Sequence, residues 1–85
     1  MARLIRESDG EGYHGSRVES YDPAQNMKLV GHKPMVGCCL KVGTVTAGTY
    51  SSRDWWMTTP ITEIISETED EIKFKTKNSV YRLIR

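Results

Sequence analysis

The sequence predicts a mainly β protein: a small antiparallel barrel or curled meander of roughly four to six strands with one short helix. Two observations carry this prediction. From Val36 onward, short apolar or β-branched runs are separated by turn signals. In the clearest run, residues 71–77, apolar or β-branched side chains alternate with charged ones. We expect one domain, with an N-terminal segment at residues 1–35 and a β-barrel core at residues 36–85.

The N-terminal segment is weakly patterned. Residues 1–6 form an apolar cluster, whereas residues 7–16 are polar, contain glycine and are expected to form a loop or tail. Residues 17–21 are expected to form a short strand with Val18 facing inward.

A short helix is predicted at residues 23–30. Asp22 can cap its start, Pro23 suits the first helical position, and Gly31 can close its end.

The first strand of the core is expected at residues 36–42. Period-2 alternation places four side chains on its buried face: Val36, Cys38, Leu40 and Val42. The next strand is expected at residues 55–66. Pro60 cannot donate a ladder hydrogen bond there, so it marks a sheet edge or a bulge.

A hairpin follows, with an acidic tip at residues 66–70. In its second strand, Ile72, Phe74 and Thr76 share the buried face. The dipeptide at 78–79 can form a tight turn, and residues 80–84 return as the last strand.

The tetrapeptide Arg-Leu-Ile-Arg occurs twice, at residues 3–6 and 82–85. Chance explains a short repeat, but both copies have strand character, so pairing of the two terminal strands also explains it. An SH3-like barrel fits this length and number of strands.

The adjacent tryptophans are the most informative feature for binding. In a strand, Trp55 and Trp56 face opposite sides of the sheet, so the core takes only one of them. We expect Trp56 in the core and Trp55 outside. With Arg53 and Tyr50 nearby, Trp55 has the composition of a protein interface. Alternatively, the N-terminal segment covers Trp55 and completes the core.

A second candidate surface is basic. Lys73, Lys75 and Lys77 share one face of their strand, and Arg82 lies on the next strand, where all four could contact a nucleic-acid backbone. Outer-face lysines also keep strands soluble and block edge pairing, and acidic residues at 67–71 reduce the local field.

Catalytic and metal chemistry have little support. Cys38 and Cys39 are neighbours, which disfavours a disulfide between them, and the spacing of His14 and His32 matches no metal motif. Neither histidine nor Glu63 has a partner that the sequence would place to orient it for acid–base work. We expect no enzyme activity, no metal and no cofactor.

The charge balance is nearly neutral, with a formal net charge of +1 at pH 7. A net charge this small does not by itself indicate nucleic-acid binding. No apolar run is long enough for a membrane span or a signal peptide, so we expect no membrane association and a cytoplasmic location.

The C-terminal half resembles short SH3-like β-barrel proteins of bacteriophages and prophages. The resemblance is carried by W-x-T-T-x-I-x-E-I at 56–64 and I-x-F-x-T-x-N-S-x-Y-x-L at 72–83. It implies a non-catalytic protein in the host cytoplasm that binds and modulates or inhibits a host macromolecule, for example a defence system such as a CRISPR nuclease. The alternative is a small nucleic-acid-binding β-barrel, or a phage regulatory or structural accessory protein. A homo-oligomer is compatible with both.

Overall fold

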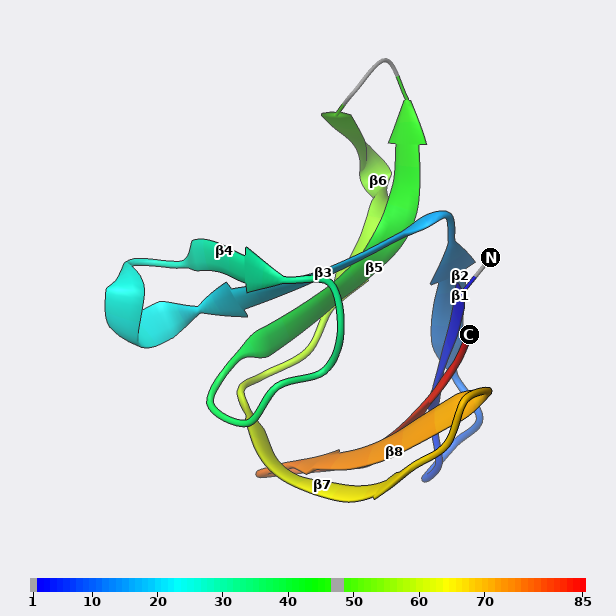
Figure 1. The fold of residues 1–85 in the computed structure, drawn as a ribbon. Coiled ribbons are helices and arrows are strands. Elements are labelled where there is room, and N and C mark those ends of the chain that lie inside the picture. Colours follow the sequence, from blue (N-terminus) through cyan, green and yellow to red (C-terminus); the bar gives the residue numbers. More distant parts are fainter. Residues whose placement is uncertain (1, 47–48) are drawn as a thin grey trace.

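The computed structural model describes residues 2–46 and 49–85, with side chains described outside residues 44–54. These residues form two antiparallel sheets (Figure 1). Sheet A has the strand order β2-β1-β9-β8-β7, and sheet B has the order β4-β3-β5-β6. The strands are β1 (Ala2–Arg6), β2 (Gly12–Gly15), β3 (Arg17–Asp22), β4 (Lys28–Gly31), β5 (Cys39–Thr46), β6 (Thr49–Met57), β7 (Ile61–Glu67), β8 (Glu71–Thr76) and β9 (Val80–Ile84), and Pro23–Gln25 form a 3₁₀ turn, η1.

The mainly β class is confirmed, but the count and closure of the strands differ from the prediction. In the described part of the chain, sheet A has five strands and sheet B has four, and the two do not close into a barrel. The additional strands lie in the N-terminal segment. Because β1 pairs with β9 and β3 pairs with β5, the expected boundary at residue 36 does not separate two structural parts.

The segment at residues 7–16, predicted as a loop or tail, contains β2. A tight turn joins β1 to β2: the amide of Gly10 donates to the carbonyl of Arg6 at 2.8 Å, and the carboxylate of Asp9 is 2.6 Å from the Arg6 guanidinium. Gly10 has φ +72°, a backbone conformation that favours glycine. Local polar contacts therefore build a hairpin where the sequence shows no apolar alternation.

The predicted helix at residues 23–30 is wrong. Its start is as expected, since the Asp22 carboxylate accepts a hydrogen bond from the Ala24 amide at 2.9 Å. Asn26 and Met27 then both adopt positive φ angles and reverse the chain. The following residues pair with β3 as β4, with Leu29 opposite Tyr21, so a local hairpin ladder replaces the last turns of a weak helix.

The terminal strands pair as the repeated tetrapeptide predicts. β1 and β9 run antiparallel, with Leu4 opposite Leu83 and Ile5 opposite Arg82. Figure 1 shows both chain ends on the same side of the molecule. The two leucines are nearly inaccessible to solvent, so each copy of the repeat supplies one core residue.

The predicted strand at residues 55–66 is two strands in two sheets. β6 ends at Met57, and β7 begins at Ile61 after the chain passes Pro60. Thr58 stays bonded to sheet B, since its amide donates to the Leu40 carbonyl at 2.8 Å and its hydroxyl accepts from the Leu40 amide at 3.1 Å. At the start of β7, the Ile61 amide donates to the Cys38 carbonyl at 2.9 Å. The proline therefore marks a crossover between sheets.

The predicted strand at residues 36–42 starts late. β5 begins at Cys39, and Val36 is 61% exposed in the preceding turn. Gly37 has φ +88° and donates its amide to the Ile61 carbonyl at 2.8 Å, which directs the chain away from an extended course. Cys38, Leu40 and Val42 are buried as predicted.

The inner faces of both sheets form one core. Phe74 is fully buried and its ring stacks on Tyr81, with 5.4 Å between ring centroids. The predicted alternation in β8 is confirmed, because Ile72 and Thr76 are also buried. The buried core cluster consists of Leu4, Leu40, Val42, Ile61, Ile72, Phe74, Tyr81 and Leu83.

The two sheets meet where β2 leads into β3. A Cβ atom on Gly15 would overlap the backbone carbonyl of Gly43 in β5. Only glycine allows this approach of the two backbones. Gly15 therefore permits the N-terminal strands to pack against sheet B.

Candidate functional site

The outward face of sheet B carries the candidate binding surface. Residues directly opposite each other in an antiparallel pair lie on the same face. Tyr21 is opposite Leu29 and Cys39, Lys41 is opposite Met57, and Gly43 is opposite Trp55. We call the set Tyr21, Leu29, Lys41, Trp55 and Met57 the tryptophan face.

The two tryptophans lie on opposite sides of β6, as predicted. Trp56 is opposite Val42 and packs against the buried core cluster. Trp55 is 41% exposed on the outward face. The predicted neighbours Tyr50 and Arg53 lie outside the residues whose side chains the structure describes.

Lys41 links two aromatic rings of the tryptophan face. Its ammonium nitrogen is 4.8 Å from the ring centroid of Trp55 and 5.9 Å from that of Tyr21. A cation over an aromatic ring is attracted to it, and this attraction holds both groups in place. The surface is thus organised before any partner arrives, which reduces the entropy lost on binding.

A partly buried hydrogen bond supports this arrangement. Glu19, the cross-strand neighbour of Lys41, is only 5% exposed, and its carboxylate accepts a hydrogen bond from the Tyr21 hydroxyl at 3.0 Å. Burial raises the pKa of the Tyr21 hydroxyl, and the Glu19 carboxylate raises it further. Tyr21 therefore stays neutral at physiological pH and remains a hydrogen-bond donor to Glu19.

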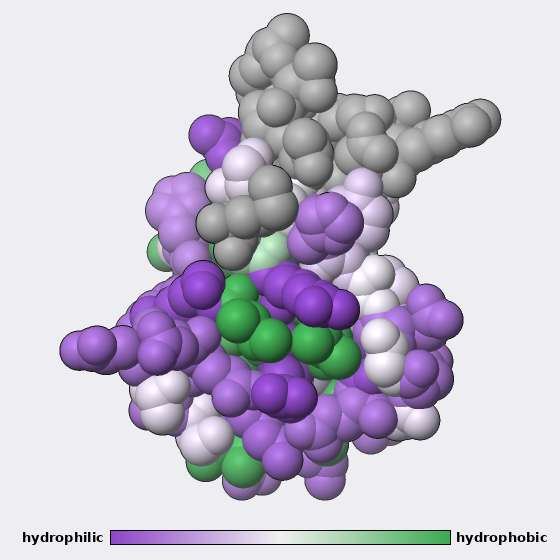
Figure 2. Space-filling model, turned by 90° about the vertical axis from the view of Figure 1, so that its right-hand side faces the viewer, coloured by the Kyte–Doolittle hydropathy of each residue, from purple (hydrophilic) through white to green (hydrophobic). Residues whose placement is uncertain are grey.

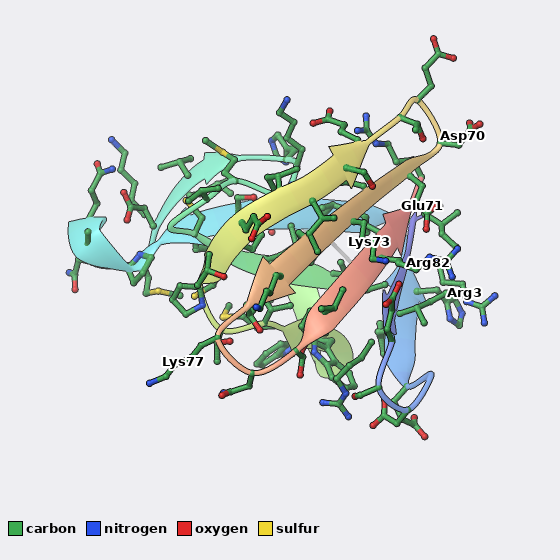
Figure 3. All side chains as sticks on the ribbon, turned by 90° about the horizontal axis from the view of Figure 1, so that it is seen from below. Arg3, Asp70, Glu71, Lys73, Lys77 and Arg82 are labelled. Carbon is green, nitrogen blue, oxygen red and sulfur yellow. The ribbon has the colours of Figure 1, made fainter. Side chains whose placement is uncertain are left out.

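The outward face of sheet A has a different character. Lys73 Nζ is 3.3 Å from a Glu7 carboxylate oxygen, and Arg82 is paired with Glu71. Figure 3 shows Lys73, Arg82 and Glu71 close together, with Lys77 far from them. The predicted basic row is therefore divided: two of its cations are neutralised, and Lys75 and Lys77 lie exposed toward the other end of β8.

The apolar residues on this face form a small patch, and charged side chains lie opposite them on the neighbouring strand. Ile5 and Ile84 are half-buried and stand opposite Arg82 and Arg3, respectively. Figure 2 shows a small apolar area surrounded by hydrophilic residues on the side of the molecule with both chain ends. Arginine stems beside isolated isoleucines are ordinary surface packing.

The cysteines do not present a reactive site. Cys38 and Cys39 are free thiols, and both are buried. Burial raises the pKa of each thiol, which keeps it protonated and a poor nucleophile or metal ligand. Among the residues that the structure describes, no group of three or more His, Cys, Asp or Glu side chains could hold a metal ion.

The histidines lie apart from each other. His14 is exposed in β2, and His32 follows β4, where its Nδ1 is 3.1 Å from the Val18 carbonyl oxygen. A carbonyl only accepts, so Nδ1 carries the hydrogen. This bond anchors the loop after β4 to the edge of β3.

Comparisons with family models, with curated proteins and with solved structures find no match to this chain. Across the residues described here, no helix has both the length and the apolar character needed to cross a membrane.

Proposed function

We propose that this chain is a non-catalytic binding protein that engages a protein partner through the tryptophan face. The observation that carries the proposal is the exposed Trp55, which Lys41 contacts on the same sheet face as Tyr21, Leu29 and Met57. Tryptophan, tyrosine and methionine are enriched at protein interfaces, and aromatic anchors supply most of the binding energy there.

The class of partner follows from the sequence resemblance to phage and prophage proteins. We propose a host macromolecule in the cytoplasm, and modulation or inhibition of that macromolecule, with defence systems as one target class. A preorganised aromatic surface on a small β protein suits this role, because it binds by complementarity and needs no reaction chemistry.

The alternative function is nucleic-acid binding through β8 and the β8–β9 turn. Its supporting observation is that Lys75 and Lys77 line a shallow cavity of about 380 Å³ together with Asn78 and Ser79. Neither lysine has an ion-pair partner in the part of the chain that is described. The paired states of Lys73 and Arg82 reduce the basic footprint, so this proposal ranks second.

Capture from a lysate of the natural host tests the two functions. Tagged protein should retain one or a few host proteins in moderate salt after nuclease treatment. Trp55→Ala should reduce that capture about tenfold or more, the size of a typical aromatic hot spot. Ile65→Ala is the matched control, since Ile65 is 43% exposed but lies on β7 in sheet A.

The alternative gives a different pattern. A nucleic-acid binder loses affinity steeply and log-linearly as salt rises, and its capture disappears with nuclease. In that case Lys75→Gln and Lys77→Gln would weaken binding and Trp55→Ala would not. That result would refute the proposed use of the tryptophan face.

A further inference from the structure

A cavity of about 280 Å³ opens between the two sheets, at the end where β1 begins and β9 ends. Its lining comes from both sheets and combines four apolar residues with the polar residues Ser16, His32, Lys33 and Arg85. Ala2, Ile72 and Leu83 line it from sheet A, and Val18 lines it from sheet B. Because the sheets do not close into a barrel here, the space between them reaches the surface.

The floor of the cavity is the core of the protein. Ile72 is inaccessible to solvent and Leu83 is 2% exposed, so both lie beneath the surface that a ligand can contact. Ala2 and Val18 are partly buried and pack against the same core cluster, and they are the apolar side chains that solvent still reaches. An apolar group in the cavity would replace water at these two residues, which is the favourable contribution in most small-molecule sites.

Three basic residues lie at the cavity's solvent side: His32, Lys33 and Arg85. The Glu67 carboxylate is 3.0 Å from the Arg85 guanidinium and 4.0 Å from the Lys33 ammonium. One side-chain carboxylate thus lies within ion-pair distance of two cationic side chains.

The His32 ring adds a polar group of fixed orientation. Its Nδ1 donates to the Val18 carbonyl, which holds the ring against the edge of β3. Nε2 is then the ring nitrogen that remains to contact a ligand. The cavity therefore combines an apolar interior with convergent polar groups, the usual composition of a ligand site.

We propose that this cavity binds a small organic anion, with its apolar body against Ala2 and Val18 and its acidic group at Lys33 and Arg85. The site is separate from the tryptophan face and does not depend on the proposed protein partner. It lies at the open end of a small β structure, a common position for ligand cavities.

The test uses 1-anilinonaphthalene-8-sulfonate as the probe and N-phenyl-1-naphthylamine as its neutral counterpart. The sulfonate should bind the folded full chain with a stoichiometry of one and with a rise in fluorescence. The neutral amine should bind about threefold more weakly or worse, because it lacks the group that the rim attracts. Near-ultraviolet circular dichroism confirms that the protein stays folded.

Five variants locate the site. Lys33→Gln and Arg85→Gln should each weaken sulfonate binding about threefold, and Glu67→Gln should strengthen it by a similar factor because a competing carboxylate charge is removed. Lys77→Gln, in the β8–β9 turn, and Trp55→Ala, on the tryptophan face, should leave it unchanged.

Several results would overturn the proposal. They are a folded chain that does not bind the sulfonate, equal affinity for the neutral amine, or unchanged affinity in the Lys33, Arg85 and Glu67 variants. Loss of sulfonate binding in Trp55→Ala would show that the probe binds the tryptophan face, and this result would also overturn the proposal.

Discussion

The outward faces of the two sheets differ, although their inner faces share one core. On sheet A, long charged side chains pair across and beyond the strands, as Lys73 does with Glu7 and Arg82 does with Glu71. On sheet B, the corresponding positions hold the tryptophan face, with Lys41 between two aromatic rings.

This difference favours one of the two outward faces as the proposed binding surface for a partner. Exposed ion pairs contribute little free energy and keep a sheet hydrated, so sheet A has the outer face of an ordinary surface sheet. An exposed tryptophan leaves apolar area in water, and the fold gains nothing from its exposure. We therefore place the proposed partner contact on sheet B, and the predictions below test this contrast.

The largest expected effect is on the shared core. Phe74→Ala removes a fully buried ring that stacks on Tyr81, and it should lower the free energy of unfolding by about 3–5 kcal/mol. Denaturant titration of the variant and the parent measures the loss. A loss below about 1 kcal/mol would mean that the inner face of sheet A is assigned wrongly.

The junction between the sheets should be the next most sensitive position. In Gly15→Ala, the new methyl group overlaps the Gly43 carbonyl, and the backbones must separate at a cost of about 1–3 kcal/mol. Thermal melts of this variant and of Ser16→Ala, an exposed neighbour, check the effect. Equal melting temperatures for both variants would contradict the close approach of β2 and β5.

Tyr21→Phe tests the support of the tryptophan face. It leaves the buried Glu19 carboxylate without its donor, which should cost about 1–3 kcal/mol near neutral pH. The folded-state pKa of Tyr21 is raised above its unfolded value of about 10. The hydrogen bond that neutral Tyr21 donates to Glu19 therefore stabilises the fold below a pH of about 10, and this stabilisation is lost as the pH rises through the raised pKa. The stability gap between parent and variant should therefore shrink in alkaline solution. A gap that widens there would contradict the assigned contact.

The smallest effect is expected on the outward face of sheet A. Lys73→Gln breaks the exposed pair with Glu7 and should cost at most about 1 kcal/mol, less in high salt. Lys75→Gln, on the same face without a described ion pair, serves as the control. A loss as large as that of Tyr21→Phe would show that charge pairing, and not only the core, holds sheet A together.

Side-chain patterns in the sequence predicted part of the structure. Alternation in residues 71–77 identified β8 and its buried face, and the repeated Arg-Leu-Ile-Arg offered the pairing of β1 with β9 as an alternative to chance. Both signals depend only on side-chain period and like-with-like pairing across strands.

The errors fall in two short hairpins, β1–β2 and β3–β4, whose turns depend on polar contacts or positive φ angles that no apolar pattern in the sequence reports. Residues 28–31 have no strong helix preference and join the ladder of β3, and β2 forms through a polar turn. In the candidate site, alternation predicted the orientation of Trp55. Tyr21 and Lys41 were missed because the register between β3, β5 and β6 brings them together, and no spacing in the sequence encodes that register.

The most direct test of the central claim compares Trp55→Ala with Trp56→Ala for both melting temperature and partner capture. Trp56 packs on the core and Trp55 does not, so Trp56→Ala should lower the melting temperature by about 10 °C or more and Trp55→Ala by less than about 5 °C. Trp55→Ala should nevertheless lose capture of the host protein while it remains folded. Equal destabilisation by both substitutions, with capture by the folded Trp55→Ala protein unchanged, would contradict the account and make both rings structural.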